Sequence, residues 1–177
     1  MTKKLVVAPF LLLAACVMCG VYGIAHNQIS YTISHEYFHA FKFQQFDSPP
    51  DIPARFAVAW VGWYASWWIG LLAGTPIVLA SLATRTLMDF THAFFSAAII
   101  AVTTAAASAG LAVAYGFLFV TSETLPGFWY PDDLANPVAF ARAGLMHTFS
   151  YLGAFAGLVF GLVSIWFAAK RSNGVTD

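Results

Sequence analysis

The residues with the clearest chemical potential stand close together near the start of the chain. His35, Glu36 and His39 form the pattern H-E-x-x-H. On a helix, residues four positions apart lie on the same face, so both imidazoles can bind one zinc ion. The carboxylate between them can then act as a general base toward a zinc-bound water. The spacing therefore predicts His35 and His39 as candidate metal ligands and Glu36 as a candidate catalytic base.

A catalytic zinc site also needs a third protein ligand and an open coordination position. No residue stands at a recognisable spacing from His39 to supply that ligand. The candidates expected on the same side of the molecule are Glu123, Asp132, Asp133, His147 and His26. Because five-residue patterns often arise by chance, we interpret the motif as a coincidental match and expect no cofactor. Zinc binding remains the alternative.

Over this short stretch the sequence resembles the zincin metalloproteases. The resemblance implies a zinc-dependent hydrolase in which His35 and His39 hold the metal and Glu36 activates water. Intramembrane metalloproteases also carry a downstream aspartate inside a membrane span, and this sequence has none there. Asn136 and Pro137 are similar to part of their second motif, but no Asp-Gly pair follows.

The composition shows which elements must position these residues. Hydrophobic residues make up 60% of the chain and charged residues only 9%, whereas soluble domains have about 25% charged residues. A chain so poor in charge cannot cover a water-facing surface. A spanning helix needs about 20 mainly apolar residues, and four stretches qualify: 5–25, 56–83, 93–120 and 143–169. We therefore predict an all-α membrane protein with four transmembrane helices in a single domain, 1–177.

The basic residues indicate the orientation of these helices. With the N-terminus inside, five basic residues are cytoplasmic: Lys3, Lys4, Arg85, Lys170 and Arg171. Three others are then outside: Lys42, Arg55 and Arg142. This bias predicts a multi-pass protein of the bacterial inner membrane with both termini in the cytoplasm.

The two loops predicted outside, 26–55 and 121–142, are expected to form a small ordered extracytoplasmic cap. In the first loop, alternating apolar residues predict two short strands, at 29–33 and 41–43. The second loop contains several turn-forming residues, among them Pro126, Gly127 and Pro131.

Glycine and aromatic residues predict how the spans pack. Gly153, Gly157 and Gly161 recur every four residues, which allows close helix packing inside the chain, with a homodimer seam as the alternative. The second span contains five aromatic residues, and their spacing places most of them along one helical stripe near the outer end: Trp60, Trp63, Tyr64, Trp67 and Trp68. We interpret them as an interfacial belt. The alternative is a surface for a quinone, a lipid or a pigment.

Cys16 and Cys19 form a C-x-x-C pair inside the first apolar run. A membrane disulfide oxidase would need a second reactive pair, and the sequence has no other cysteine. A thiol within a span is also far from the setting that favours a thiolate. Lys3 and Lys4 before the apolar run also fit a signal peptide, but the run continues past Cys16, which favours a retained helix.

A second resemblance covers about a third of the chain. It rests on the runs ISYTIS at 29–34, EYF at 36–38, FKF at 41–43 and WWIGL at 67–71. These runs are similar to an uncharacterised group of small four-helix bacterial membrane proteins. The resemblance implies no activity. It implies that His35 and His39 need not be histidine, and that Glu36 is a structural residue paired with Lys42 or Arg55.

The distribution of charged residues bears on function. No acidic or basic residue stands in the middle of a span, although ion and proton pathways usually need one. The chain has no basic tract, which excludes nucleic-acid binding. We expect a non-enzymatic membrane protein whose outer cap binds a lipid or a membrane-protein partner, with a homo-oligomer as a further option. The alternative is a zinc-dependent membrane metallohydrolase that uses the H-E-x-x-H motif.

Overall fold

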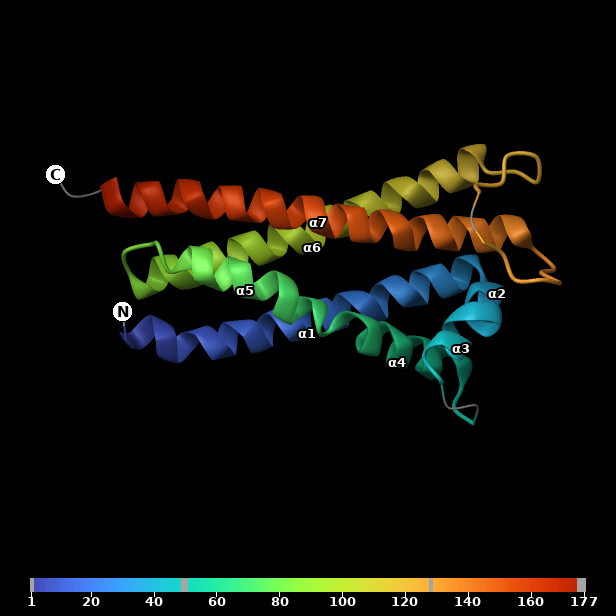
Figure 1. Cartoon of the computed structure of the whole chain (residues 1–177), viewed down its shortest axis with the longest axis horizontal. Helices are drawn as coiled ribbons and strands as arrows, with labels where there is room; N and C mark the ends of the chain where they lie inside the picture. Colours follow the sequence, from blue (N-terminus) through green and yellow to red (C-terminus); the bar gives the residue numbers. More distant parts are fainter. Residues whose placement is uncertain (1, 49–50, 128, 175–177) are drawn as a thin grey trace.

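The computed structural model describes residues 2–48, 51–127 and 129–174 of the chain. These residues form helices and loops without strands (Figure 1). Four helical stretches have the length and hydropathy of membrane spans: Thr2–Ile33, Ala54–Ser81, Leu87–Phe119 and Pro137–Gly174. The chain is therefore an all-helical protein of the multi-pass membrane class, as the sequence predicts.

The first, third and fourth stretches are the single helices α1 (Thr2–Ile33), α6 (Leu87–Phe119) and α7 (Pro137–Gly174). The second is divided into α4 (Ala54–Ser66) and α5 (Ile69–Ser81), with an interruption at Trp67 and Trp68. Three short helices connect α1 to α4: α2 (His35–Tyr37), the π-helix η1 (Phe38–Lys42) and α3 (Phe43–Gln45). We call residues 35–45 the wedge.

α1, α6 and α7 extend beyond their predicted bounds because hydropathy detects only the apolar part of a helix. α6 begins at Leu87, where Thr86 and Asp89 form a capping box: the Asp89 N–H donates to Thr86 Oγ1 at 3.0 Å, and the Thr86 N–H donates to Asp89 Oδ2 at 3.3 Å. Such a cap satisfies backbone donors that the helix itself leaves free. α1 continues to Ile33, and Ser34 then caps the wedge by accepting a hydrogen bond from the Tyr37 N–H at 3.1 Å.

The predicted strands at 29–33 and 41–43 are wrong, since the first belongs to α1 and the second to η1 and α3. The alternation over five residues is coincidental. In α1 the polar Ser30 is fully buried, while the apolar Ile29 is 55% exposed. This inside-out pattern is expected where lipid surrounds a helix and polar groups find partners within the bundle.

The helices associate as two pairs, α1 with α4 and α5, and α6 with α7 (Figure 1). Glycine allows the close approach in both pairs. Gly23 and Gly62 face each other, so a Cβ on either would collide with the backbone of the other. Gly153, Gly157 and Gly161 lie against α6, and a Cβ on Gly157 would come 2.8 Å from Ala101 Cα. The glycine row of the fourth span therefore packs within the chain.

The two pairs are joined differently at their two ends. Near the termini they meet in a continuous apolar core: Leu11, Ala15, Ile77, Val78, Phe90, Ala93, Phe94, Ala97, Ala98 and Ile165. At the other end the wedge lies beside the ends of α1 and α4, below α7 in the view of Figure 1. Its buried Tyr37 and Phe38 pack with Tyr31 of α1, Val58 of α4 and Phe140 of α7. The wedge thus packs against both pairs at this end.

Candidate ligand chamber between the helix pairs

The two histidines of the H-E-x-x-H motif are exposed and flank a tyrosine. His39 Nε2 lies 3.3 Å from the Tyr31 hydroxyl oxygen. The His35 ring meets the Tyr31 ring edge to face, with centroids 4.5 Å apart. Among the described residues, no group of three His, Cys, Asp or Glu side chains gathers where a metal could be held. The zinc site remains a prediction, and the structure places no third ligand beside it.

Glu36 has a structural contact that the sequence did not reveal. Its two carboxylate oxygens accept hydrogen bonds from the backbone N–H groups of Ala135 at 2.7 Å and Asn136 at 2.8 Å. These donors immediately precede α7, where the helix dipole favours a negative charge. The pairing with Lys42 or Arg55 implied by the second resemblance is not formed. Lys42 donates to Gln45, and the Arg55 guanidinium donates to α1.

The candidates for a third zinc ligand are dispersed. Glu123, Asp132 and Asp133 are exposed in the loop before α7. His147 is buried in α7. Its ring stacks against the Tyr37 ring, with centroids 4.9 Å apart. His26 is buried in α1, and its ring meets that of His147 at a centroid distance of 4.5 Å. The structure therefore gathers these two histidines with each other and not with the motif.

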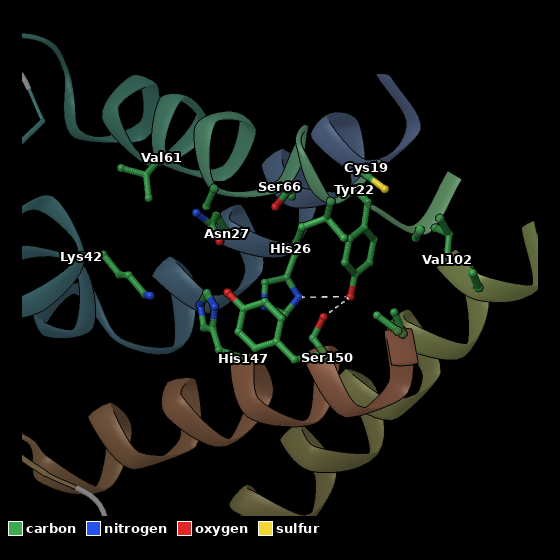
Figure 2. Close-up of a pocket in the computed structure, with 18 of the residues that line it drawn as sticks. Cys19, Tyr22, His26, Asn27, Lys42, Val61, Ser66, Val102, His147 and Ser150 are labelled. Carbon is green, nitrogen blue, oxygen red and sulfur yellow. Dashed lines mark hydrogen bonds between the residues drawn. The ribbon is translucent and has the colours of Figure 1, made fainter. Parts of the chain in front are cut away.

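His26 and His147 line a cavity of about 90 Å³ between the two helix pairs (Figure 2). This volume has room for several water molecules or for a small polar group. The polar lining comes mainly from α1 and α7: Tyr22, His26, Asn27, His147, Ser150 and Tyr151. The apolar lining comes mainly from α4, α5 and α6, on either side of the interruption at Trp67 and Trp68. We call this cavity the chamber.

Hydrogen bonds link α1 to α7 across the chamber. The Tyr22 hydroxyl lies 2.7 Å from Ser150 Oγ and 3.4 Å from His26 Nδ1 (Figure 2). Deeper toward the wedge, Ser30 Oγ lies 3.0 Å from His147 Nε2. Together with the wedge, these contacts hold the helix pairs at a fixed separation.

One polar atom of the chamber has no partner. His26 is only 7% exposed, and its Nε2 makes no hydrogen bond within the described structure. An unsatisfied buried polar group costs about 1–3 kcal/mol. A hydrogen-bonding group within the chamber would therefore satisfy this nitrogen.

Lys42 of η1 closes the chamber from the wedge side. It is 9% exposed, and its ammonium donates to Gln45 Oε1 at 2.9 Å. The ammonium also lies over three aromatic rings, at 4.8 Å from the centroid of Phe41 and 5.8 Å from those of Tyr37 and Phe46. Burial lowers the pKa of Lys42 to about 8. Figure 2 shows this side chain directed toward the two histidines.

Sequence reasoning treated His26 and His147 only as spare ligands for the zinc motif and missed the chamber. A signal was present in α1, where Tyr22, His26 and Ser30 recur every four residues. Such spacing places them on one face. His147 and Ser150 form a matching pair on α7, but the sequence cannot show that the two faces meet.

Comparisons with protein-family models, with curated proteins and with solved structures find no match to this chain. The role of the chamber therefore has to be argued from its own residues.

Proposed function

We propose that this protein is a non-enzymatic membrane protein that binds a lipid-like amphiphile, with the polar head of the ligand in the chamber. The observation that carries the proposal is the buried, unpartnered Nε2 of His26 in a cavity whose other walls are largely apolar. Ligand sites commonly combine apolar walls with a few placed polar groups. Polar residues within spans are also functional candidates by default.

The position of the chamber supports an amphiphile over a water-soluble ligand. Tyr151 lines the chamber and is nevertheless 53% exposed on the flank of α7. The chamber is thus continuous with the surface that faces lipid in a membrane. An alkyl chain can lie along that surface while its head reaches His26. Lys42 of the wedge lines one wall of the chamber. Phe46, the first residue after the wedge, also lines it.

We propose further that the wedge and the loop before α7 form a cap outside the cytoplasm of a bacterial cell, with both termini inside. The basic residues support this orientation, since five of eight lie on the proposed inner side. The ligand would then come from the outer leaflet.

Lipid retention tests the proposal directly. Ala65 lines the chamber, whereas Ala107 is exposed on the outer face of α6. Purified full-length protein is compared with the Ala65→Phe and Ala107→Phe variants by native mass spectrometry in mild detergent. We expect one retained lipid in the wild type and in Ala107→Phe, and a loss of about tenfold in Ala65→Phe, because the added ring fills the chamber. Equal retention in all three proteins, or none in the wild type, would refute the proposal.

A further inference from the structure

The chamber contains a positive charge that the protein does not neutralise. Lys42 is nine-tenths buried, and the only oxygen to which its ammonium donates is the neutral Oε1 of Gln45. Within residues 2–48, 51–127 and 129–174, no carboxylate accepts a hydrogen bond from this ammonium. Burying an ammonium ion without a counterion is strongly unfavourable. The three aromatic faces around it offset only part of that cost.

The nearest acidic side chain along the sequence, Asp47, is exposed, and Lys42 donates to Gln45 and not to it. The next nearest is already occupied. Glu36 belongs to the wedge, but both of its oxygens are directed to the backbone before α7. The acidic residue of α6, Asp89, binds Thr86 and Ser172 at the opposite end of the bundle. The counterion for Lys42 therefore has to come from outside the described chain.

One direction of the hydrogen-bond chain gives His26 a donor toward the chamber. Ser150 can donate to the Tyr22 oxygen, and the Tyr22 hydroxyl then donates to His26 Nδ1. In a neutral imidazole, one ring nitrogen accepts and the other donates. Nε2 then carries the proton, and the chamber receives an N–H donor that has no acceptor.

We propose that the head of the bound amphiphile is anionic, a phosphate or a carboxylate, and that it accepts hydrogen bonds from the Lys42 ammonium and from His26 Nε2. This inference rests on the function proposed above and specifies its ligand class. An oxyanion satisfies both groups at once, since it supplies a charge and several acceptor atoms. It would also bridge η1 to α1, so binding would fasten the wedge to the first helix pair.

Competition between lipid heads tests this inference. Delipidated full-length protein is equilibrated with mixed micelles that contain equal amounts of phosphatidylglycerol and phosphatidylcholine, and retained lipid is measured by native mass spectrometry. We expect the wild type to prefer phosphatidylglycerol by about tenfold or more, because charge-assisted hydrogen bonds are the stronger ones. Lys42→Met should abolish the preference, and Lys42→Arg should keep most of it. Lys3→Met removes an exposed lysine near the N-terminus and should change nothing.

A second arm keeps the test decisive if Lys42→Met fails to fold. On the wild type, dodecyl phosphate should displace the retained lipid at a concentration about tenfold lower than dodecanol does. Retention of both lipid heads to the same extent would overturn the anionic head and leave the proposed function standing. Failure to retain any lipid would overturn both. Thermal stabilisation by inorganic phosphate alone, without lipid retention, would assign the site to a free anion and also overturn the lipid ligand.

Discussion

At the scale of single residues, Glu36 shows how a motif of catalytic type can serve structure. The residue stands between two histidines, yet its carboxylate caps the start of a helix about a hundred positions later. Those two hydrogen bonds make protein stability a measurable property of this side chain.

Replacement of Glu36 by alanine should lower the free energy of unfolding by about 1–3 kcal/mol, because two backbone donors lose a charged acceptor. Glu36→Gln keeps one side-chain oxygen and should cost less than Glu36→Ala. Thermal unfolding in detergent, followed by circular dichroism, measures both. Glu123→Ala, at an exposed site in the loop between α6 and α7, is the control. Unchanged stability in Glu36→Ala would show that the cap contributes nothing.

The zinc motif itself can be tested by elemental analysis of protein purified without a histidine tag. We expect His35→Ala and His39→Ala to leave the metal content unchanged, because catalytic zinc needs three protein ligands and the structure gathers two. His92→Ala, on α6, is the control. About one equivalent of zinc in the wild type, lost in both motif variants but not in the control, would establish the metallohydrolase alternative.

In the protein without bound lipid, Lys42 should make the free energy of unfolding depend on pH. Its pKa is about 8 when folded and returns to its ordinary value of 10.5 on unfolding. Between these values the unfolded chain binds more protons, so stability rises with pH. From pH 8 to pH 9.5 we expect a gain of about 2 kcal/mol, followed as the thermal unfolding midpoint.

Other titratable groups face the same chamber: Cys19, Tyr22, His26, Tyr37, His147 and Tyr151. Ordinary histidine and tyrosine values lie outside this pH window, whereas that of cysteine lies inside it. The measurement therefore uses a Cys19→Ala background. Lys42→Met in that background should remove the gain, and a gain of equal size in that variant would contradict the assignment.

At the scale of helices, glycine determines how closely the pairs approach. Gly157→Leu should destabilise the protein by about 2–3 kcal/mol, because the new side chain would collide with the backbone of α6 at Ala101. Gly110→Leu is a matched control, since a Cβ there meets nothing within 4 Å. Thermal stability in detergent distinguishes the two. If both variants unfold at the same temperature, Gly157 does not pack closely against α6.

The same scale shows where sequence reasoning succeeds and where it fails. The four spans were predictable because hydropathy over about 20 residues depends on the surrounding solvent and little on tertiary contacts. Only part of the wedge was predictable as helix. The H-E-x-x-H spacing indicates one helical turn, whereas the following turns are held by Tyr37 and Phe38 against three distant helices. The chamber was missed for a related reason. It exists only where the polar face of α1 meets that of α7, and no local pattern encodes such a meeting.

At the scale of the whole molecule, the orientation in the membrane is open to a direct test. Gln44 is exposed on the wedge, so Gln44→Cys in a background without Cys16 and Cys19 provides one accessible thiol. We expect a membrane-impermeant reagent to label it in intact cells, because the distribution of basic residues favours the proposed orientation with both termini inside. Ser172→Cys, near the C-terminal end of α7, should react only after permeabilisation. The reverse labelling pattern would invert the topology.

The contact between Glu36 and the start of α7 also constrains how the protein is made. Its partner Ala135 lies 99 residues later in the chain. At about 5–20 residues per second, a ribosome needs roughly 5–20 s to synthesise that interval. During this time the wedge lacks both its cap and the α7 surface on which Phe38 and Tyr37 pack. Closure of the chamber is therefore among the last events of biogenesis, since it waits for the synthesis of α7.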